Sequence, residues 1–230
     1  MRVLGAAAVV MAVVACPCWD DNRGVGAAQS GGGRNANDAT FYRVPLMCSA
    51  VRGLGCGTRA KPVLLDLQRK SIVREAWLND AGDVLAVVWT RGSSDTDRES
   101  AVKATAAAHD VSMDLLAGEA RDTVSTSFGS GTGWHRGIDV DRLSEREAQV
   151  ISDRLMQRVS TTTPSVRPKI PKVAPVVTEA IRGFLVNGCS SLERCRDALL
   201  AEAGRYFSAS ELDALRAAIQ KGLEPVGDER

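Results

Sequence analysis

The pattern of hydrophobic and polar residues changes period several times between positions 40 and 117. Short runs rich in β-branched and aromatic side chains are typical of strands, whereas apolar residues spaced three or four positions apart are typical of helices. The pattern predicts a strand at 41–46, a helix at 59–73, strands at 75–79 and 84–89 joined by a turn at 80–83, a helix at 98–109 and a strand at 111–116. The predicted order of elements is therefore β-α-β-β-α-β.

Helical patterns dominate the rest of the chain. Two capping-box sequences, Ser144 with Glu147 and Ser208 with Glu211, each predict the start of an amphipathic helix. Amphipathic helices are predicted at 144–159, 176–187, 190–206 and 208–223. In contrast, residues 118–142 lack a clear period and are predicted to form a surface loop.

The order of elements favours an α+β fold class, with a ferredoxin-like β-α-β-β-α-β domain followed by a small all-helical C-terminal segment. The α+β domain, with its helical extension, is predicted at 40–159. Residues 160–175 hold four prolines among basic residues, which predicts an extended linker and a domain boundary. A helical domain is predicted at 176–230, and because its core is small, we expect a disulfide or a docking partner to help it fold.

The N-terminal residues 1–15 contain one basic residue followed by an unbroken apolar run. The length of the run suits a secretory signal and is too short to span a membrane, so we predict an export signal. The run ends Val13-Val14-Ala15-Cys16, which is similar to a bacterial lipobox and predicts lipidation of Cys16 as the first mature residue. Ordinary cleavage after Ala15, or after a nearby small residue, is the alternative. Residues 16–39, rich in Gly, Ala, Asn and Ser, are typical of a flexible linker.

The charge balance limits the classes of function. The chain has 29 basic and 28 acidic residues, a formal net charge of +1. No basic excess is present to release counterions from a phosphate backbone, so nucleic-acid binding is not expected. The two histidines, His109 and His135, are isolated, and neither a catalytic-triad order nor zinc-type spacing accompanies them. The sequence therefore favours a protein that is not an enzyme.

A glycine-rich segment, Gly53-Leu54-Gly55-Cys56-Gly57-Thr58-Arg59, opens the first predicted helix. With the helix and hairpin that follow, residues 40–117 resemble the heavy-metal-associated domain, in which a Gly-Met-x-Cys-x-x-Cys loop precedes the first helix and two thiolates bind a soft cation. Cys56 falls on the first metal-binding cysteine of that motif. Arg59 falls on the second, and a guanidinium has no lone pair to give to a metal ion. The resemblance thus implies a soft-metal site at Cys56 whose second ligand comes from elsewhere.

Cys48 lies eight positions before Cys56, and the loop between them could fold back to bring the two sulfurs together. Three outcomes are open. Cys48 replaces the missing metal ligand, the two cysteines form a disulfide, as thiol pairs do outside the cytoplasm, or both thiols stay unpaired. Arg59, beside Cys56 at a helix N-terminus, is expected to lower the pKa of the Cys56 thiol and so to act as a thiolate stabiliser.

A second pair of cysteines lies in the predicted helical domain. Ser190 and Glu193 predict a helix N-cap between Cys189 and Cys195, which places one cysteine just outside the helix and the other on its second turn. The sequence therefore predicts a Cys189–Cys195 disulfide. Such a bond would stabilise the domain by about 2 kcal/mol.

Together these patterns predict an exported, lipid-anchored protein on the periplasmic side of the bacterial cell envelope. Its predicted role is to bind or handle a soft metal ion, Cu(I) or Hg(II), through Cys48 and Cys56, with no other cofactor. Its predicted partners are the membrane, reached through the lipid on Cys16, and an envelope protein. The alternative is a non-catalytic envelope interaction module that keeps the fold and has lost metal binding. A third hypothesis, a thiol redox enzyme, needs a resolving cysteine near Cys56.

Overall fold

The computed structural model describes residues 36–188 and 191–225, and residues 33–230 form one compact unit. The predicted export signal at 1–15, the lipidation site Cys16 and most of the linker at 16–39 lie outside the described residues, so they stay predictions. Among the described helices, none is both long and apolar enough to cross a membrane.

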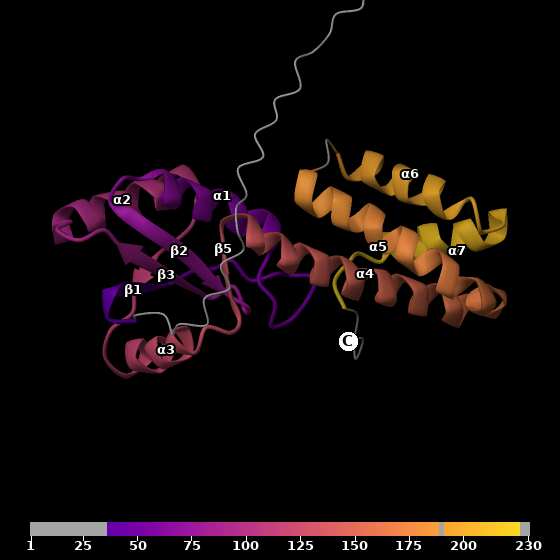
Figure 1. Ribbon diagram of the computed structural model, residues 1–230. Helices are drawn as coiled ribbons and strands as arrows, with labels where there is room; N and C mark the ends of the chain where they lie inside the picture. The colour runs from indigo at the N-terminus through magenta and orange to yellow at the C-terminus, as the bar shows by residue number, and fades with distance from the viewer. Residues whose placement is uncertain (1–35, 189–190, 226–230) are drawn as a thin grey trace, which may run out of the picture. The chain divides into compact units, whose positions relative to one another are not determined.

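Five short strands form one antiparallel sheet in the order β4-β1-β3-β2-β5 (Figure 1). They are β1 (Ala39–Arg43), β2 (Val73–Asn79), β3 (Val84–Trp89), β4 (Asp114–Leu115) and β5 (Trp134–Arg136). The register places Ala86 of β3 opposite Phe41 of β1 and Trp77 of β2. β3 is therefore the central strand, and all six of its residues are buried.

Helices cover both faces of this sheet. They are α1 (Gly57–Arg69), α2 (Asp95–Ala108) and α3 (Gly118–Ser130). Figure 1 shows α1 and α2 over one face and α3 over the other. On the first face, Leu64 and Leu67 of α1 share a hydrophobic core with Leu78 and Leu85 of the sheet. Burial of these large apolar side chains is the main term that holds the helix on the sheet.

The second face carries a separate aromatic core. The Phe128 ring of α3 lies 5.6 Å from the Phe41 ring, 6.2 Å from the Trp77 ring and 5.0 Å from the Trp134 ring, measured between centroids. All three contacts are edge-to-face, the arrangement that the charge distribution of aromatic rings favours. Phe128 therefore attaches α3 to the sheet.

The C-terminal half of the chain is helical. Its elements are α4 (Asp141–Thr162), a 3-10 helix η3 (Pro164–Lys169), α5 (Ile170–Asn187), α6 (Leu192–Ala203) and α7 (Ala209–Gln220), and short 3-10 helices also occur at Ala36–Asp38 and Gly137–Val140. α4 contacts α1 at one end and packs along α5 and α7 (Figure 1). Leu143, Ile151 and Leu155 of α4 belong to the same core as α1 and the sheet.

The predicted fold class, a ferredoxin-like domain with a small helical tail, is wrong. Helices make up 62% of the described structure, in seven α-helices beside one small five-stranded antiparallel sheet. The surface loop predicted at 118–142 contains α3 and β5 instead, because Phe128 and Trp134 bury against the second face of the sheet. The strand predicted at 111–116 is reduced to the two residues of β4.

The extended linker predicted at 160–175 is also wrong in its backbone conformation. Pro164 and Pro171 lie in the first turns of η3 and α5, where a helix tolerates proline because no intrahelical N–H bond is lost. Val166 and Val173 are fully buried in the common core. These apolar contacts hold the segment helical. The domain boundaries predicted from the sequence stay predictions.

Candidate functional site

The segment at 44–56, between β1 and α1, folds back on itself as a tight loop. The Cys48 N–H donates to the Leu54 carbonyl at 2.8 Å, and the Cys56 N–H donates to the Leu46 carbonyl at 2.7 Å. When two extended segments pair antiparallel, residues directly opposite each other have their side chains on the same side of the pair. Residues two positions apart within one segment also have their side chains on the same side. The side chains of Cys48 and Cys56 therefore lie on the same face of the loop.

Two distant parts of the chain fix this loop. The Leu46 N–H donates to the Gly82 carbonyl, in the turn between β2 and β3, at 3.0 Å. From α4, Arg154 donates through Nη1 to the Ala50 carbonyl at 2.9 Å. The loop is thus held between the sheet and the C-terminal helices, and its inner face is removed from water.

Glu147 of α4 lies close to both cysteines: it interacts with the Cys48 thiol by a hydrogen bond and with Cys56 through its charge. Its side chain is only 5% exposed, and its Oε2 has no hydrogen-bond partner among the described residues. Burial raises the pKa of Glu147, and a hydrogen-bonding interaction with the Cys48 thiol partly opposes that rise. The capping box predicted for Ser144 and Glu147 is therefore wrong, because α4 already begins at Asp141 and both residues lie in the core.

Burial also raises the pKa of Cys48, to about 12, with a further contribution from the Glu147 carboxylate. Cys56 is the N-cap residue of α1. Burial raises the pKa of its thiol more than the backbone amide and charge of Arg59 lower it, and the charge of Glu147 adds to the rise. Arg59 thus acts on the Cys56 thiol in the predicted direction, but removal from water outweighs this one exposed guanidinium, so the pKa of Cys56 is raised on balance.

Both thiols are free in the structure, so the Cys48–Cys56 disulfide considered from the sequence is not formed here. In the part of the chain that the structure describes, no three or more His, Cys, Asp and Glu residues are grouped closely enough to hold a metal ion. A metal at this loop would therefore have two sulfur ligands. That donor set fits a soft ion, which thiolates select over harder ones.

The remaining predicted residues lie elsewhere. Cys195 lies on α6, but Cys189 is outside the described residues, so their disulfide stays a prediction. His135 Nε2 lies 2.6 Å from Asp80 Oδ1, and His109 Nε2 lies 3.8 Å from Asp66 Oδ2. Each histidine thus faces a carboxylate, and the Asp80 carbonyl also accepts a hydrogen bond from the Gly55 N–H of the thiol loop at 2.7 Å.

Comparison of the chain with protein-family models, curated proteins and solved structures finds no match. The resemblance to the heavy-metal-associated domain therefore stays a prediction that rests on the residues quoted for it.

The two thiols should differ in reactivity. At pH 8 a thiol with a pKa of about 12 is ionised in about one molecule in ten thousand, and only the thiolate is alkylated. We expect iodoacetamide to modify Cys56 well before Cys48 in the folded protein. The Cys48 rate should still rise about tenfold per pH unit up to pH 10. Peptide mapping by mass spectrometry follows each cysteine separately.

Unfolding in urea is the control, since it should make the two rates equal. A Cys48 rate equal to that of Cys56 in folded protein, or one that levels off near pH 9, would contradict the assigned burial.

Proposed function

We propose that this chain binds one soft metal ion, Cu(I) or Hg(II), between Cys48 and Cys56 in the bacterial cell envelope. The observation that carries the proposal is that two free thiols share one face of a fixed loop and both lie in the field of the same buried carboxylate, Glu147. The apolar signal and lipobox-like sequence at 1–16 support the location.

The spacing of the two cysteines suits a single ion. Residues placed diagonally across an antiparallel pair have Cα atoms about 7–8 Å apart, and their side chains approach more closely. Two metal–sulfur bonds of about 2.3 Å each would join such side chains. No large movement of the loop is then needed, which matters because the loop is bonded to both the sheet and α4.

The buried carboxylate supplies a place for a proton. Both thiols must lose their protons to become ligands, and two thiolates beside an ionised Glu147 would put three negative charges in a site shielded from water. Because burial raises the pKa of Glu147, this residue can take up the proton from Cys48. The bound form then has two thiolates and a neutral carboxylic acid, which lowers the cost of burying charge.

We expect the reduced protein to bind one Cu(I), and Cys48→Ser and Cys56→Ser each to weaken binding at least a hundredfold, because one thiolate is lost in each. Arg59→Cys should strengthen binding by adding a sulfur at the position of the second cysteine of the resembled motif. Competition with a Cu(I) chelator measures the affinities. Ser49→Ala, at an exposed position of the same loop, is the matched control and should bind as the parent does.

The number of protons released tests the role of Glu147. We expect the parent to release one proton to solvent per Cu(I) at pH 8, and Glu147→Gln to release two, because glutamine cannot accept one. Calorimetry in two buffers with different ionisation enthalpies measures this number. If both serine variants bind like the parent, or the fully reduced parent binds nothing, the metal proposal fails.

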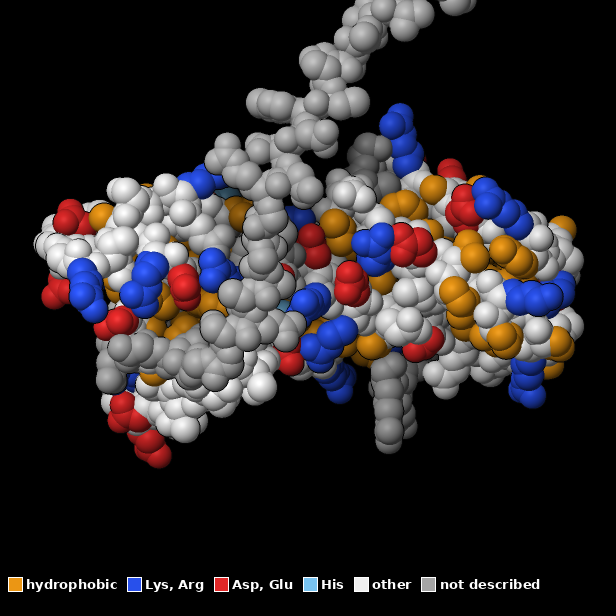
Figure 2. Space-filling view, in the orientation of Figure 1, with side chains coloured by type: hydrophobic (Ala, Val, Ile, Leu, Met, Phe, Trp, Pro, Cys, Tyr) orange, Lys and Arg blue, Asp and Glu red, His pale blue; other side chains and the backbone are white. Residues whose placement is uncertain are grey.

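A second candidate is a non-catalytic envelope interaction module. Two observations favour it: the pKa of Cys48 is raised to about 12, which disfavours the thiolate, and apolar side chains are exposed on the C-terminal helices. Leu192, at the start of α6, is 87% exposed. On the face shown in Figure 2, hydrophobic side chains gather over these helices with basic side chains around them. A fully reduced protein that binds no soft metal would favour this module.

A further inference from the structure

The chain that follows α7 turns back to cross α4 (Figure 1). Its residues 221–225 form a segment that we call the C-terminal strap. Two arginines of α4, one helical turn apart, bond to the backbone of the strap. Arg158 donates through Nη2 to the Glu224 carbonyl at 2.8 Å. Arg154 donates through Nη1 to the Leu223 carbonyl. The strap is therefore held on α4 by its backbone carbonyls.

Arg154 also joins the strap to the thiol loop. The same Nη1 atom that donates to the Leu223 carbonyl donates to the Ala50 carbonyl of the loop at 2.9 Å. A terminal guanidinium nitrogen carries two N–H groups, so each carbonyl takes one. The strap and the loop are distant in the sequence, and this arginine links them directly.

The guanidinium of Arg154 is shielded from water. Arg154 is 3% exposed, whereas Leu223 of the strap, whose carbonyl it bonds, is 40% exposed. The strap thus forms part of the outer cover of this cation. Burying a charge is costly unless hydrogen bonds satisfy it, so Arg154 stays bonded to Ala50 while the strap keeps water away. When the strap detaches, water reaches the guanidinium and replaces the Ala50 carbonyl as its acceptor.

Release of Ala50 opens the thiol loop on the side that α4 closes. The preceding part of the loop stays on the sheet, because the Leu46 N–H is bonded to the Gly82 carbonyl. Cys48 lies between these two attachments and is 8% exposed. Since burial is the main cause that raises the pKa of Cys48 to about 12, opening at Ala50 both exposes its sulfur and brings that pKa back toward its ordinary value.

We propose that the C-terminal strap is a gate for the thiol site. Docked on α4, it keeps Cys48 closed through Arg154. Detached, it lets a metal ion enter or leave between Cys48 and Cys56. Such an opening breaks the bonds of one segment only, so it needs less free energy than unfolding of the whole chain. The exchange of metal rests on the proposed function, whereas the control of thiol access does not.

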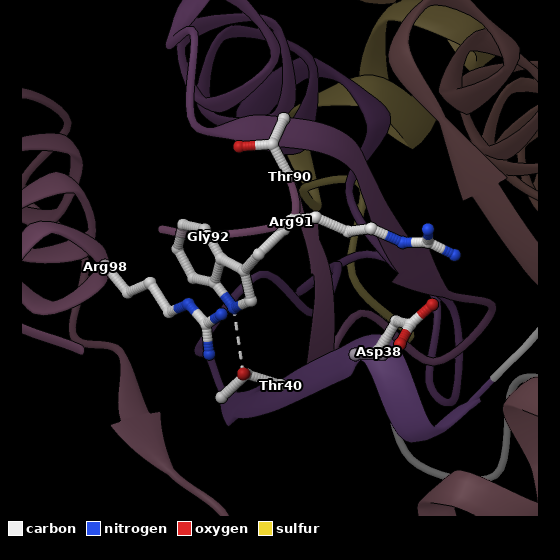
Figure 3. A pocket seen from close by; sticks show the side chains of 8 residues that line it. Asp38, Thr40, Thr90, Arg91, Gly92 and Arg98 are labelled. Atoms are coloured by element: carbon white, nitrogen blue, oxygen red, sulfur yellow. Dashed lines mark hydrogen bonds between the residues drawn. The ribbon is translucent and has the colours of Figure 1, made fainter. Parts of the chain in front are cut away.

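A matched pair of glycine variants tests the gate. Gly222 of the strap has a φ of +88°, Gly92 in the turn between β3 and α2 (Figure 3) has a φ of +84°, and a Cβ at either position meets nothing within 4 Å. Alanine therefore adds a similar backbone strain at both. At Gly222 the strain is relieved by redirecting the strap away from α4. We expect Gly222→Ala to speed up the modification of Cys48 by iodoacetamide at pH 8 about tenfold, and Gly92→Ala to leave it within about twofold of the parent.

A double variant tests whether Arg154 carries the effect. Arg154→Met should itself speed up the modification of Cys48, because the bond to Ala50 is lost. Adding Gly222→Ala to it should cause no further increase, since the strap acts on the loop through Arg154. Circular dichroism shows whether each variant is folded. The glycine pair decides on its own if Arg154→Met does not fold.

Release of Cu(I) to an excess of chelator separates the gate from the metal site. Gly222→Ala should release Cu(I) faster than the parent, and Gly92→Ala should release it at the parent's rate. If the parent binds no Cu(I) while the modification rates differ as expected, the proposed function fails and the gate stands. If the two alanine variants speed up the modification of Cys48 equally, or if Gly222→Ala reacts like the parent, the gate is overturned whether or not the metal binds.

Discussion

Gly82→Ala should lower the free energy of unfolding by about 3 kcal/mol, because it combines backbone strain with overpacking. Gly82 has a φ of +75°, a conformation that costs a residue with a side chain about 1–2 kcal/mol. A Cβ here would also lie 2.5 Å from both the Gly55 Cα and the Leu46 carbonyl oxygen. The backbone of the thiol loop would have to move away from the turn between β2 and β3.

Gly92→Ala is a matched control for this prediction. Gly92 has a φ of +84°, but a Cβ there would meet nothing within 4 Å. It should therefore show only the conformational cost, about 1–2 kcal/mol. Urea unfolding followed by circular dichroism measures both variants, and faster alkylation of Cys48 in Gly82→Ala would report the loosened loop. Equal destabilisation by the two substitutions would show that the close approach of Gly82 to Gly55 adds nothing to the loss in the free energy of unfolding.

A second large decrease in the free energy of unfolding is expected for Arg158→Met. Arg158 of α4 is 6% exposed and donates to three backbone carbonyls after or at the end of α7, those of Ala218 (3.2 Å), Gly222 (2.6 Å) and Glu224 (2.8 Å). These groups have no helical partners of their own at a helix C-terminus. Methionine fills a similar volume but donates nothing. Leaving the buried Ala218 carbonyl unpaired costs about 1–3 kcal/mol, whereas Gly222 and Glu224 are exposed and their carbonyls can bond to water, so we expect a loss of about 3 kcal/mol or less.

Arg142→Met separates this effect from a general loss of charge on α4, because Arg142 is exposed on the same helix. It should change the free energy of unfolding by less than about 0.5 kcal/mol. Hydrogen exchange measured by mass spectrometry should show α7 and the residues after it opening first in Arg158→Met. An unchanged exchange pattern with unchanged stability would mean that Arg158 does not hold the C-terminal segment.

Short-range patterns in the sequence predicted several elements correctly. The turn between β2 and β3 falls at 80–83 as expected, and Asn79 Oδ1 accepts the N–H groups of Asp83 and Val84, each at 3.1 Å. The capping box of Ser208 and Glu211 is also formed at the start of α7. In each case the groups that satisfy one another lie within five residues along the chain. Such interactions can be read from the sequence because no distant segment is needed to complete them.

The fold class and the surroundings of the site depended on distant segments. The loop predicted at 118–142 holds a helix because Phe128 finds three aromatic partners on β1, β2 and β5. Cys48 and Cys56 were predicted from their spacing, but Glu147 was not identified as part of their site. A glutamate that follows a serine by three positions is typical of a helix start. Only its place between two apolar residues of one helix face, Leu143 and Ile151, could have indicated burial.

The sequence by itself determined where the hairpin turns and how the last helix begins, and it pointed to Cys48 and Cys56 as the candidate thiols of the loop, because residue type and local spacing suffice for these features. The tertiary structure alone decided the surroundings of the two thiols. Arg59 is near Cys56 in the sequence and predicted a lowered thiol pKa, whereas α4, which follows the sheet, buries the loop and raises the pKa of both thiols. How deeply a group is buried depends on every segment that packs around it, and the spacing of nearby residues in the sequence does not show this.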